Sequence, residues 1–137
     1  MTALRVVLDS NVVISGFFFG GPPGRVLEYL LEGTVQGYSS LPLLDEIRDV
    51  LQRPKFGLSP EQALGFVEAF RDLVGIVKPG KRVRAVTEDP QDNAVLECAA
   101  AARAGMIVSG DNHLLRLGRW RGVEIISPRE FVSRMER

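Results

Sequence analysis

The sequence contains one cysteine and one histidine and has no excess of charge of either sign. A single cysteine, Cys98, cannot form an internal disulfide, which excludes a disulfide-stapled fold. A single histidine, His113, excludes a histidine-rich metal site, and the usual cysteine and histidine ligands of zinc are missing with it. The 17 basic and 17 acidic residues cancel, so any basic surface for nucleic acid must be local.

Long hydrophobic runs are also absent. The longest apolar stretch, at 11–21, is interrupted by Ser15 and Gly20 and is too short to span a bilayer. The first ten residues lack a secretory pattern, because their apolar segment closes on Asp9. We therefore expect no membrane association and a cytoplasmic location. A chain of 137 residues is too short for two domains, so residues 1–137 are expected to form one.

Strand patterns and helix patterns alternate along the chain. Apolar runs of strand type occur at 4–8, 35–40, 76–79, 106–111 and 123–127, and helical spacing occurs at 24–33, 41–54, 59–75, 89–105, 113–117 and 128–135. Ser59 and Gln62 have capping-box spacing, and Gly33 and Gly105 are placed to end helices. This alternation predicts parallel strands joined by helices on both faces. Ligands of such folds bind beyond the carboxyl ends of the strands.

Three acidic residues fall where that edge is expected. Asp9 follows the first strand directly, and Asp111 follows the strand that begins at Met106. Asp92 lies in the first turn of the helix that leads into the same strand. Each has an alternative interpretation. Asp9 and Asp111 are also suited to cap helices. Asp92 is also suited to pair with Asp89 in a capping-box pattern, where its negative charge complements the helix dipole.

A fourth acid, Glu46, lies on the border of the apolar stripe of its helix, whereas Asp45 and Asp49 point away from that stripe. Taken alone, Glu46 is typical of ordinary surface charge. Carboxylates gathered at one edge repel each other unless a cation lies among them. Oxygen ligands suit Mg²⁺ or Mn²⁺, and such a site indicates metal-dependent phosphate chemistry, with nuclease and phosphomonoester activity both open.

Two classes of enzyme with an acid after the first strand fit poorly. A phosphatase that uses Asp9 as nucleophile needs a second acid two residues later, and that position is Asn11. A receiver domain needs a late lysine, and none follows Lys81. A catalytically silent module that binds RNA or protein stays open.

Five segments make the chain resemble the PIN-domain family, above all its toxin components (VapC-like ribonucleases) in prokaryotic toxin–antitoxin systems. These segments are VVLDSNVVISG, LLDEIRDVL, DPQDNAVLECAAAA, IVSGDNHLLRL and VEIISPREFV. The resemblance implies a three-layer α/β/α sandwich around a parallel sheet of about five strands. It also implies metal-dependent hydrolysis of single-stranded RNA, an antitoxin partner and a homodimer.

The resemblance also assigns residues. The family's acidic quartet, catalytic and metal-binding, falls on Asp9, Glu46, Asp92 and Asp111, and auxiliary polar positions match Ser10, Asn11, Asp89 and Ser109.

Two basic segments are candidates for binding RNA phosphates. The first supplies Lys81, Arg82 and Arg84, and the second supplies Arg116, Arg119 and Arg121. Trp120, within the second segment, is suited either to stack on a base or to pack into the protein. The apolar segment 17–24 is either core that enters a loop or an exposed rim that suits an antitoxin peptide or a second copy.

Overall fold

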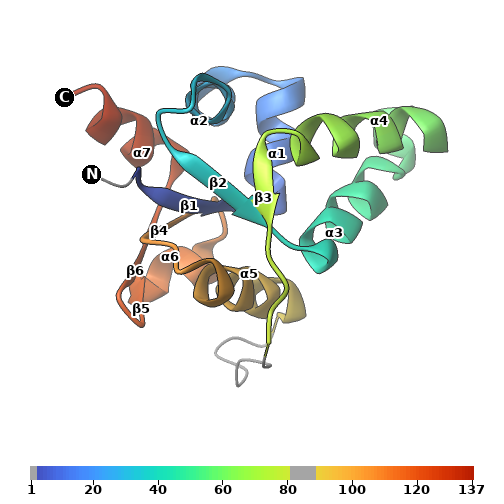
Figure 1. Cartoon of the computed structure of the whole chain (residues 1–137). Coiled ribbons are helices and arrows are strands. Elements are labelled where there is room, and N and C mark those ends of the chain that lie inside the picture. The colour runs from blue at the N-terminus through green and yellow to red at the C-terminus, as the bar shows by residue number, and fades with distance from the viewer. Residues whose placement is uncertain (1–2, 81–88) are drawn as a thin grey trace.

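The structure is a computed structural model that describes residues 3–80 and 89–137 (Figure 1). Its strands are β1 (Arg5–Leu8), β2 (Gln36–Ser39), β3 (Val74–Ile76), β4 (Met106–Val108), β5 (Arg119–Trp120) and β6 (Val123–Ile126). Its helices are α1 (Ser10–Phe18), α2 (Gly21–Glu32), α3 (Leu41–Leu51), η1 (Pro54–Phe56, a 3-10 turn), α4 (Pro60–Arg71), α5 (Pro90–Ala102), α6 (Asn112–Leu117) and α7 (Pro128–Met135).

Within the described residues the strands form one six-stranded sheet of order β3-β2-β1-β4-β6-β5. All neighbouring strands are parallel except β5, which pairs antiparallel with β6. The α/β architecture expected from the sequence is therefore confirmed. Strand β5 was not expected, because two residues are too few to show a hydrophobic pattern.

Helices cover both faces of the sheet. Val6 and Leu8 of β1 pack into one hydrophobic cluster with α1, α2, α3, α4 and α7. Val7, between them in sequence, packs into a second cluster that contains Val95, Leu96 and Leu114 of α5 and α6. Figure 1 shows α5 and α6 below the sheet, with α1, α2 and α7 above it. The chain therefore forms the three layers that alternating strands and helices predict.

Helix α1 was not expected from the sequence. Its residues are mostly apolar, and Val12, Val13 and Ile14 are all buried, so the segment lacks the polar face that identifies a surface helix. Gly16 allows α1 to pack closely on α2, since a Cβ at this position would lie 2.6 Å from Leu27 Cδ1.

Several element boundaries differ from those expected. Strand β3 begins and ends earlier than the segment 76–79. Helix α5 ends before Gly105 because Arg103 takes a left-handed conformation with φ of 52°. Gly105 instead lies directly before β4, and its N–H donates to the carbonyl of Arg5. The Ser59 capping box and the left-handed Gly33 at the end of α2 are confirmed.

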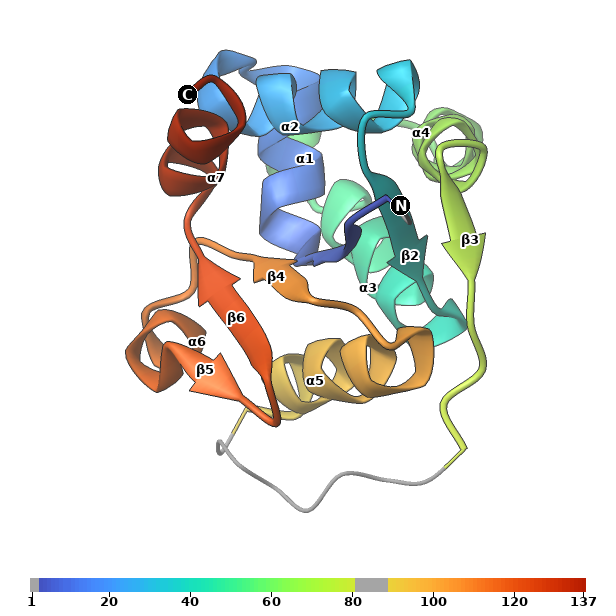
Figure 2. The same cartoon turned by 60° about the vertical axis from the view of Figure 1, so that its left-hand side comes forward.

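The order of the strands reverses direction between β1 and β4. From β1 the chain moves outward through β2 to β3, and α5 then returns it to β4 on the opposite side of β1 (Figure 2). The segments that leave β1 and β4 enter α1 and α6, which cover opposite faces. Ligands of open α/β sheets bind at such a switch point. In the described part of the chain, no helix combines the length and apolar character needed to cross a membrane.

Candidate metal centre

Asp9 lies directly after the carboxyl end of β1, at this switch point. Its side chain is buried, with 6% of the residue exposed. Its main-chain N–H donates to the Val108 carbonyl, which joins the ends of β1 and β4. Asp9 occupies the N-cap position of α1, yet its carboxylate accepts no capping hydrogen bond. Helix capping therefore does not explain why an acid is buried here.

Ser109 connects two of the acids. Its hydroxyl donates to Asp9 Oδ2 at 2.7 Å and accepts the main-chain N–H of Asp111 at 3.0 Å. Ser109 is fully buried, so this bridge is shielded from water and fixes the end of β4 against the end of β1. Ser10, also buried, lies with its hydroxyl 3.4 Å from Asp9 Oδ1, whereas Asn11 is exposed in the first turn of α1.

Asp92 and Asp111 meet at this edge although they lie on different helices. Asp92 lies in the first turn of α5 and is only 3% exposed. One ligand atom each from Asp92, Asp111 and His113 lies within 4.8 Å of the other two. The place of His113 in this cluster was not expected from the sequence, because the count of histidines excludes a histidine-rich site without showing where a single histidine lies.

The alternative interpretation of Asp111 as a helix cap also holds. Its Oδ1 accepts the N–H groups of His113 at 2.7 Å and Leu114 at 3.2 Å. Asp89 caps α5 in the same manner by accepting the Gln91 N–H at 2.9 Å. Asp111 therefore has two roles in the geometry: one oxygen holds the start of α6, and the carboxylate belongs to the acid cluster.

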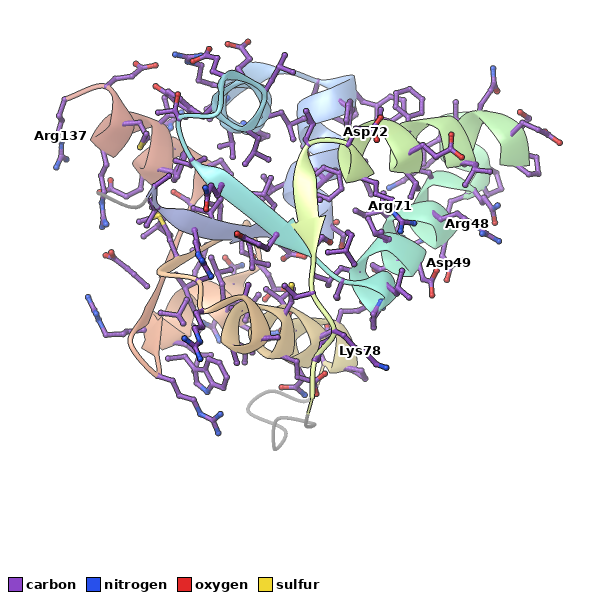
Figure 3. All side chains as sticks on the ribbon, viewed as in Figure 1. Arg48, Asp49, Arg71, Asp72, Lys78 and Arg137 are labelled. Carbon is purple, nitrogen blue, oxygen red and sulfur yellow. The ribbon has the colours of Figure 1, made fainter. Side chains whose placement is uncertain are left out.

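Glu46 reaches the same region from α3. It is partly buried, whereas Asp45 and Asp49 are exposed, and Figure 3 shows Asp49 projecting away from the sheet. This is the orientation that the apolar stripe predicts. One carboxylate oxygen of Glu46 accepts a hydrogen bond from the Gln91 side chain of α5. Gln91 had no signal in the sequence beyond its place in the first turn of a helix.

The electrostatics of the edge favour a cation. Burial raises the pKa of the Asp9 carboxyl, and the nearby Asp111 raises it further, while the Ser109 hydrogen bond opposes both effects. Burial also raises the pKa of Glu46, with smaller contributions from neighbouring acids that include Asp9, although Arg53 lowers it. Within residues 3–80 and 89–137, no salt bridge reaches Asp9. Crowded carboxylate oxygens of this kind fit Mg²⁺ or Mn²⁺.

Of the basic residues expected to bind RNA, the three that the structure describes are not gathered at this edge. Lys81, Arg82 and Arg84 lie outside the described residues. Arg119 and Arg121 lie near the amino end of β6, because β5 runs antiparallel and pairs Trp120 with Val123. The carboxyl edge is at the other end of that strand. Arg116, exposed in the last turn of α6, is nearer to Asp111 along the chain.

Trp120 packs against the second hydrophobic cluster and is partly buried. The guanidinium of Arg121 lies over its ring, 4.6 Å from the ring centre. Of the two interpretations of Trp120, the geometry favours packing.

The metal-free protein should lose stability as pH rises. The pKa of Asp9 lies above its ordinary 3.8 in the folded state, so the folded protein binds this proton more tightly than the unfolded chain does. The favourable contribution is complete below the unfolded value and is lost as pH rises through the folded value. We expect Asp9→Asn to melt on the order of 3 °C higher than the parent protein at pH 7 without metal, and to lose this advantage in acid.

Thermal unfolding followed by circular dichroism, from acid to pH 7, measures the difference in melting temperature between Asp9→Asn and the parent protein. Asp45→Asn is the control at an exposed position. A lower melting temperature for metal-free Asp9→Asn at pH 7 would instead show that the carboxylate stabilises the fold.

Comparisons with known proteins agree with this fold. The family model described as "PIN domain" matches residues 5–113. The chain is 27% identical over 146 residues to the uncharacterized protein MJ1680 of Methanocaldococcus jannaschii, covering 98% of this chain and 93% of that one.

Two solved structures have a similar fold. One is VapBC2 from Rickettsia felis bound to a DNA fragment from its promoter, with a TM-score of 0.65 and 15% identity over 90% of this chain and 98% of that chain. The other is DNA-bound VapBC from Salmonella typhimurium, with a TM-score of 0.63 and 18% identity over 91% of this chain and 98% of that chain.

Proposed function

The chain belongs to the PIN-domain family, and from that premise we propose that it is a metal-dependent endoribonuclease that hydrolyses phosphodiester bonds of single-stranded RNA. The observation that supports this most is the buried Asp9 at the switch point of the sheet, bridged through Ser109 to Asp111. An acid buried without a capping role or a salt bridge among the described residues lowers stability, and binding a cation would offset that cost.

Each acid has a distinct part in this proposal. Asp92 and Asp111 hold the divalent ion, Mg²⁺ or Mn²⁺, since their ligand atoms are already close together. Asp9 adds a charge that Ser109 orients, and Glu46 adds one from α3 that Gln91 orients. When bound, the ion supplies positive charge at the scissile phosphate and lowers the pKa of an attacking water.

The auxiliary positions have mainly positioning roles. Ser109 fixes Asp9 against Asp111, Asp89 holds the first turn of α5, and Ser10 lies against the Asp9 carboxylate. Asn11 is exposed in the first turn of α1 and is proposed to contact the RNA.

Arg116 is the described arginine proposed to bind the RNA phosphates nearest the acids. It is five residues from Asp111, and a helix rises about 1.5 Å per residue, so the two lie about 7.5 Å apart along the axis of α6. Arg119 and Arg121 would bind RNA that continues toward the opposite edge of the sheet. Lys81, Arg82 and Arg84 keep the same proposed role.

We further propose that the chain, as one PIN-like domain over 1–137, acts in the cytoplasm as the toxin of a toxin–antitoxin pair. The similar structures are described as VapBC complexes, which supports an antitoxin as partner. Phe19 at the end of α1 is 78% exposed, while Phe18 packs on Phe56 and Phe66. This apolar rim suits an antitoxin peptide or a second copy of the chain in a homodimer.

The test is cleavage of an unstructured, end-labelled RNA by the full chain. We expect internal scission with Mg²⁺ or Mn²⁺ and none with a chelator. If no RNA from a varied set is cut with either ion, the enzyme proposal fails and a silent binding module is favoured. Turnover of mononucleotides without scission of RNA would point to a phosphatase.

A further inference from the structure

The single histidine of the chain lies beside the acids of the proposed metal centre. His113 is the second residue of α6, and its Nδ1 is 3.9 Å from Asp111 Oδ1. A ligand atom of His113 also lies within 4.8 Å of one from Asp92. No other histidine exists in the sequence, so an imidazole at this edge can come only from His113.

The main chain of His113 is held in place, whereas its side chain can move. Asp111 Oδ1 accepts the His113 N–H at 2.7 Å, which ties the backbone of the first turn of α6 to the acid. The His113 side chain is 65% exposed, so its imidazole can rotate without displacing packed neighbours.

The separations are close to those that one ion requires. Two ligand atoms of a small cation, each about 2.1 Å from it, lie at most about 4.2 Å apart. The Nδ1–Oδ1 separation of 3.9 Å is within that limit. All separations within the trio are below 4.8 Å, and the exposed imidazole of His113 can rotate to shorten those that involve it.

We propose that His113 donates an imidazole nitrogen to the cation held by Asp92 and Asp111, so that the site prefers Mn²⁺ to Mg²⁺. This inference rests on the proposed function, which supplies the metal centre. Mg²⁺ takes oxygen ligands and resists replacing them, whereas a nitrogen ligand favours the transition metals. A site of carboxylates alone would distinguish the two ions less.

The main test is electron spin-echo spectroscopy of Mn²⁺ bound to the tag-free full chain. Because His113 is the only histidine, any imidazole coupling belongs to it. We expect a directly coordinated ¹⁴N signal that changes to ¹⁵N when the protein is labelled at histidine and disappears in His113→Gln. Mn²⁺ that binds without this signal would overturn the proposal.

A second measurement covers the metal preference. In calorimetric titrations of the full chain with each ion alone, His113→Gln should weaken Mn²⁺ binding about tenfold and change Mg²⁺ binding less than about twofold. Asn112→Ala, an exposed change one residue away on α6, is the matched control and should leave both affinities unchanged. Equal losses for both ions would show that His113 acts on the acids only indirectly and would overturn the inference.

Different results would contradict the proposed metal centre and the assignment of His113 as a ligand. If neither ion binds the parent protein, the metal centre itself is wrong and the proposed function fails with it. If Mn²⁺ binds and Asp111→Asn abolishes that binding, but no histidine coupling is found, only the assignment of His113 fails.

Discussion

Asp9→Asn is expected to lower the rate of RNA cleavage at least about 1000-fold, a loss of roughly 4 kcal/mol of transition-state stabilisation. The substitution keeps the shape of the side chain and an oxygen that can accept the Ser109 hydrogen bond. It removes the negative charge that the proposed cation needs nearby. Single-turnover cleavage at saturating Mn²⁺ measures the effect on the chemical step.

Asp45→Asn is the matched control, because Asp45 lies on α3 one residue before Glu46 with its side chain exposed. It should cleave at the parental rate. If Asp9→Asn retained more than a tenth of the parental rate while folded, the charge of Asp9 would not have the large catalytic role proposed for it.

The second large effect concerns Asp92. An ion that binds only the folded state stabilises it by about 2.7 kcal/mol at one hundred times its dissociation constant. For a chain of this size, that amounts to a rise in melting temperature of about 10 °C. We expect the parent protein to show this rise with Mn²⁺, and Asp92→Asn to show less than about 3 °C at the same concentration.

Comparing each variant with and without Mn²⁺ separates metal binding from folding, because any structural effect of the substitution is present in both melts. Asp49→Asn, exposed on α3 (Figure 3), should keep the full rise. An undiminished response of Asp92→Asn to Mn²⁺ would exclude Asp92 as a ligand.

Much of this edge could be predicted from the order of residues. Asp9 and Asp111 each end an apolar run, and parallel strands bring their carboxyl ends to the same edge. The border position of Glu46 on its helix also predicted correctly that it turns inward while Asp49 does not.

Other features could not be predicted from local sequence patterns, because they depend on how distant segments pack together. Helix α1 is buried on so many sides that it has no polar stripe, and Arg103 ends α5 in a conformation that glycine usually takes. Arg121 is ten residues from Asp111, yet α6 and β5 carry the chain toward the amino end of β6. Nearness in sequence therefore suggested that Arg121 lies close to Asp111, whereas the two lie toward opposite ends of the strands.

The position of the bound ion tests the central claim most directly. Crystals of the full chain grown with Mn²⁺ and measured with anomalous scattering from manganese should show one strong peak. We predict that it contacts Asp92 and Asp111, next to Asp9 and the Ser109 hydroxyl. A peak on another surface, or none at millimolar Mn²⁺, would contradict the claim that folding gathers these acids to hold a metal.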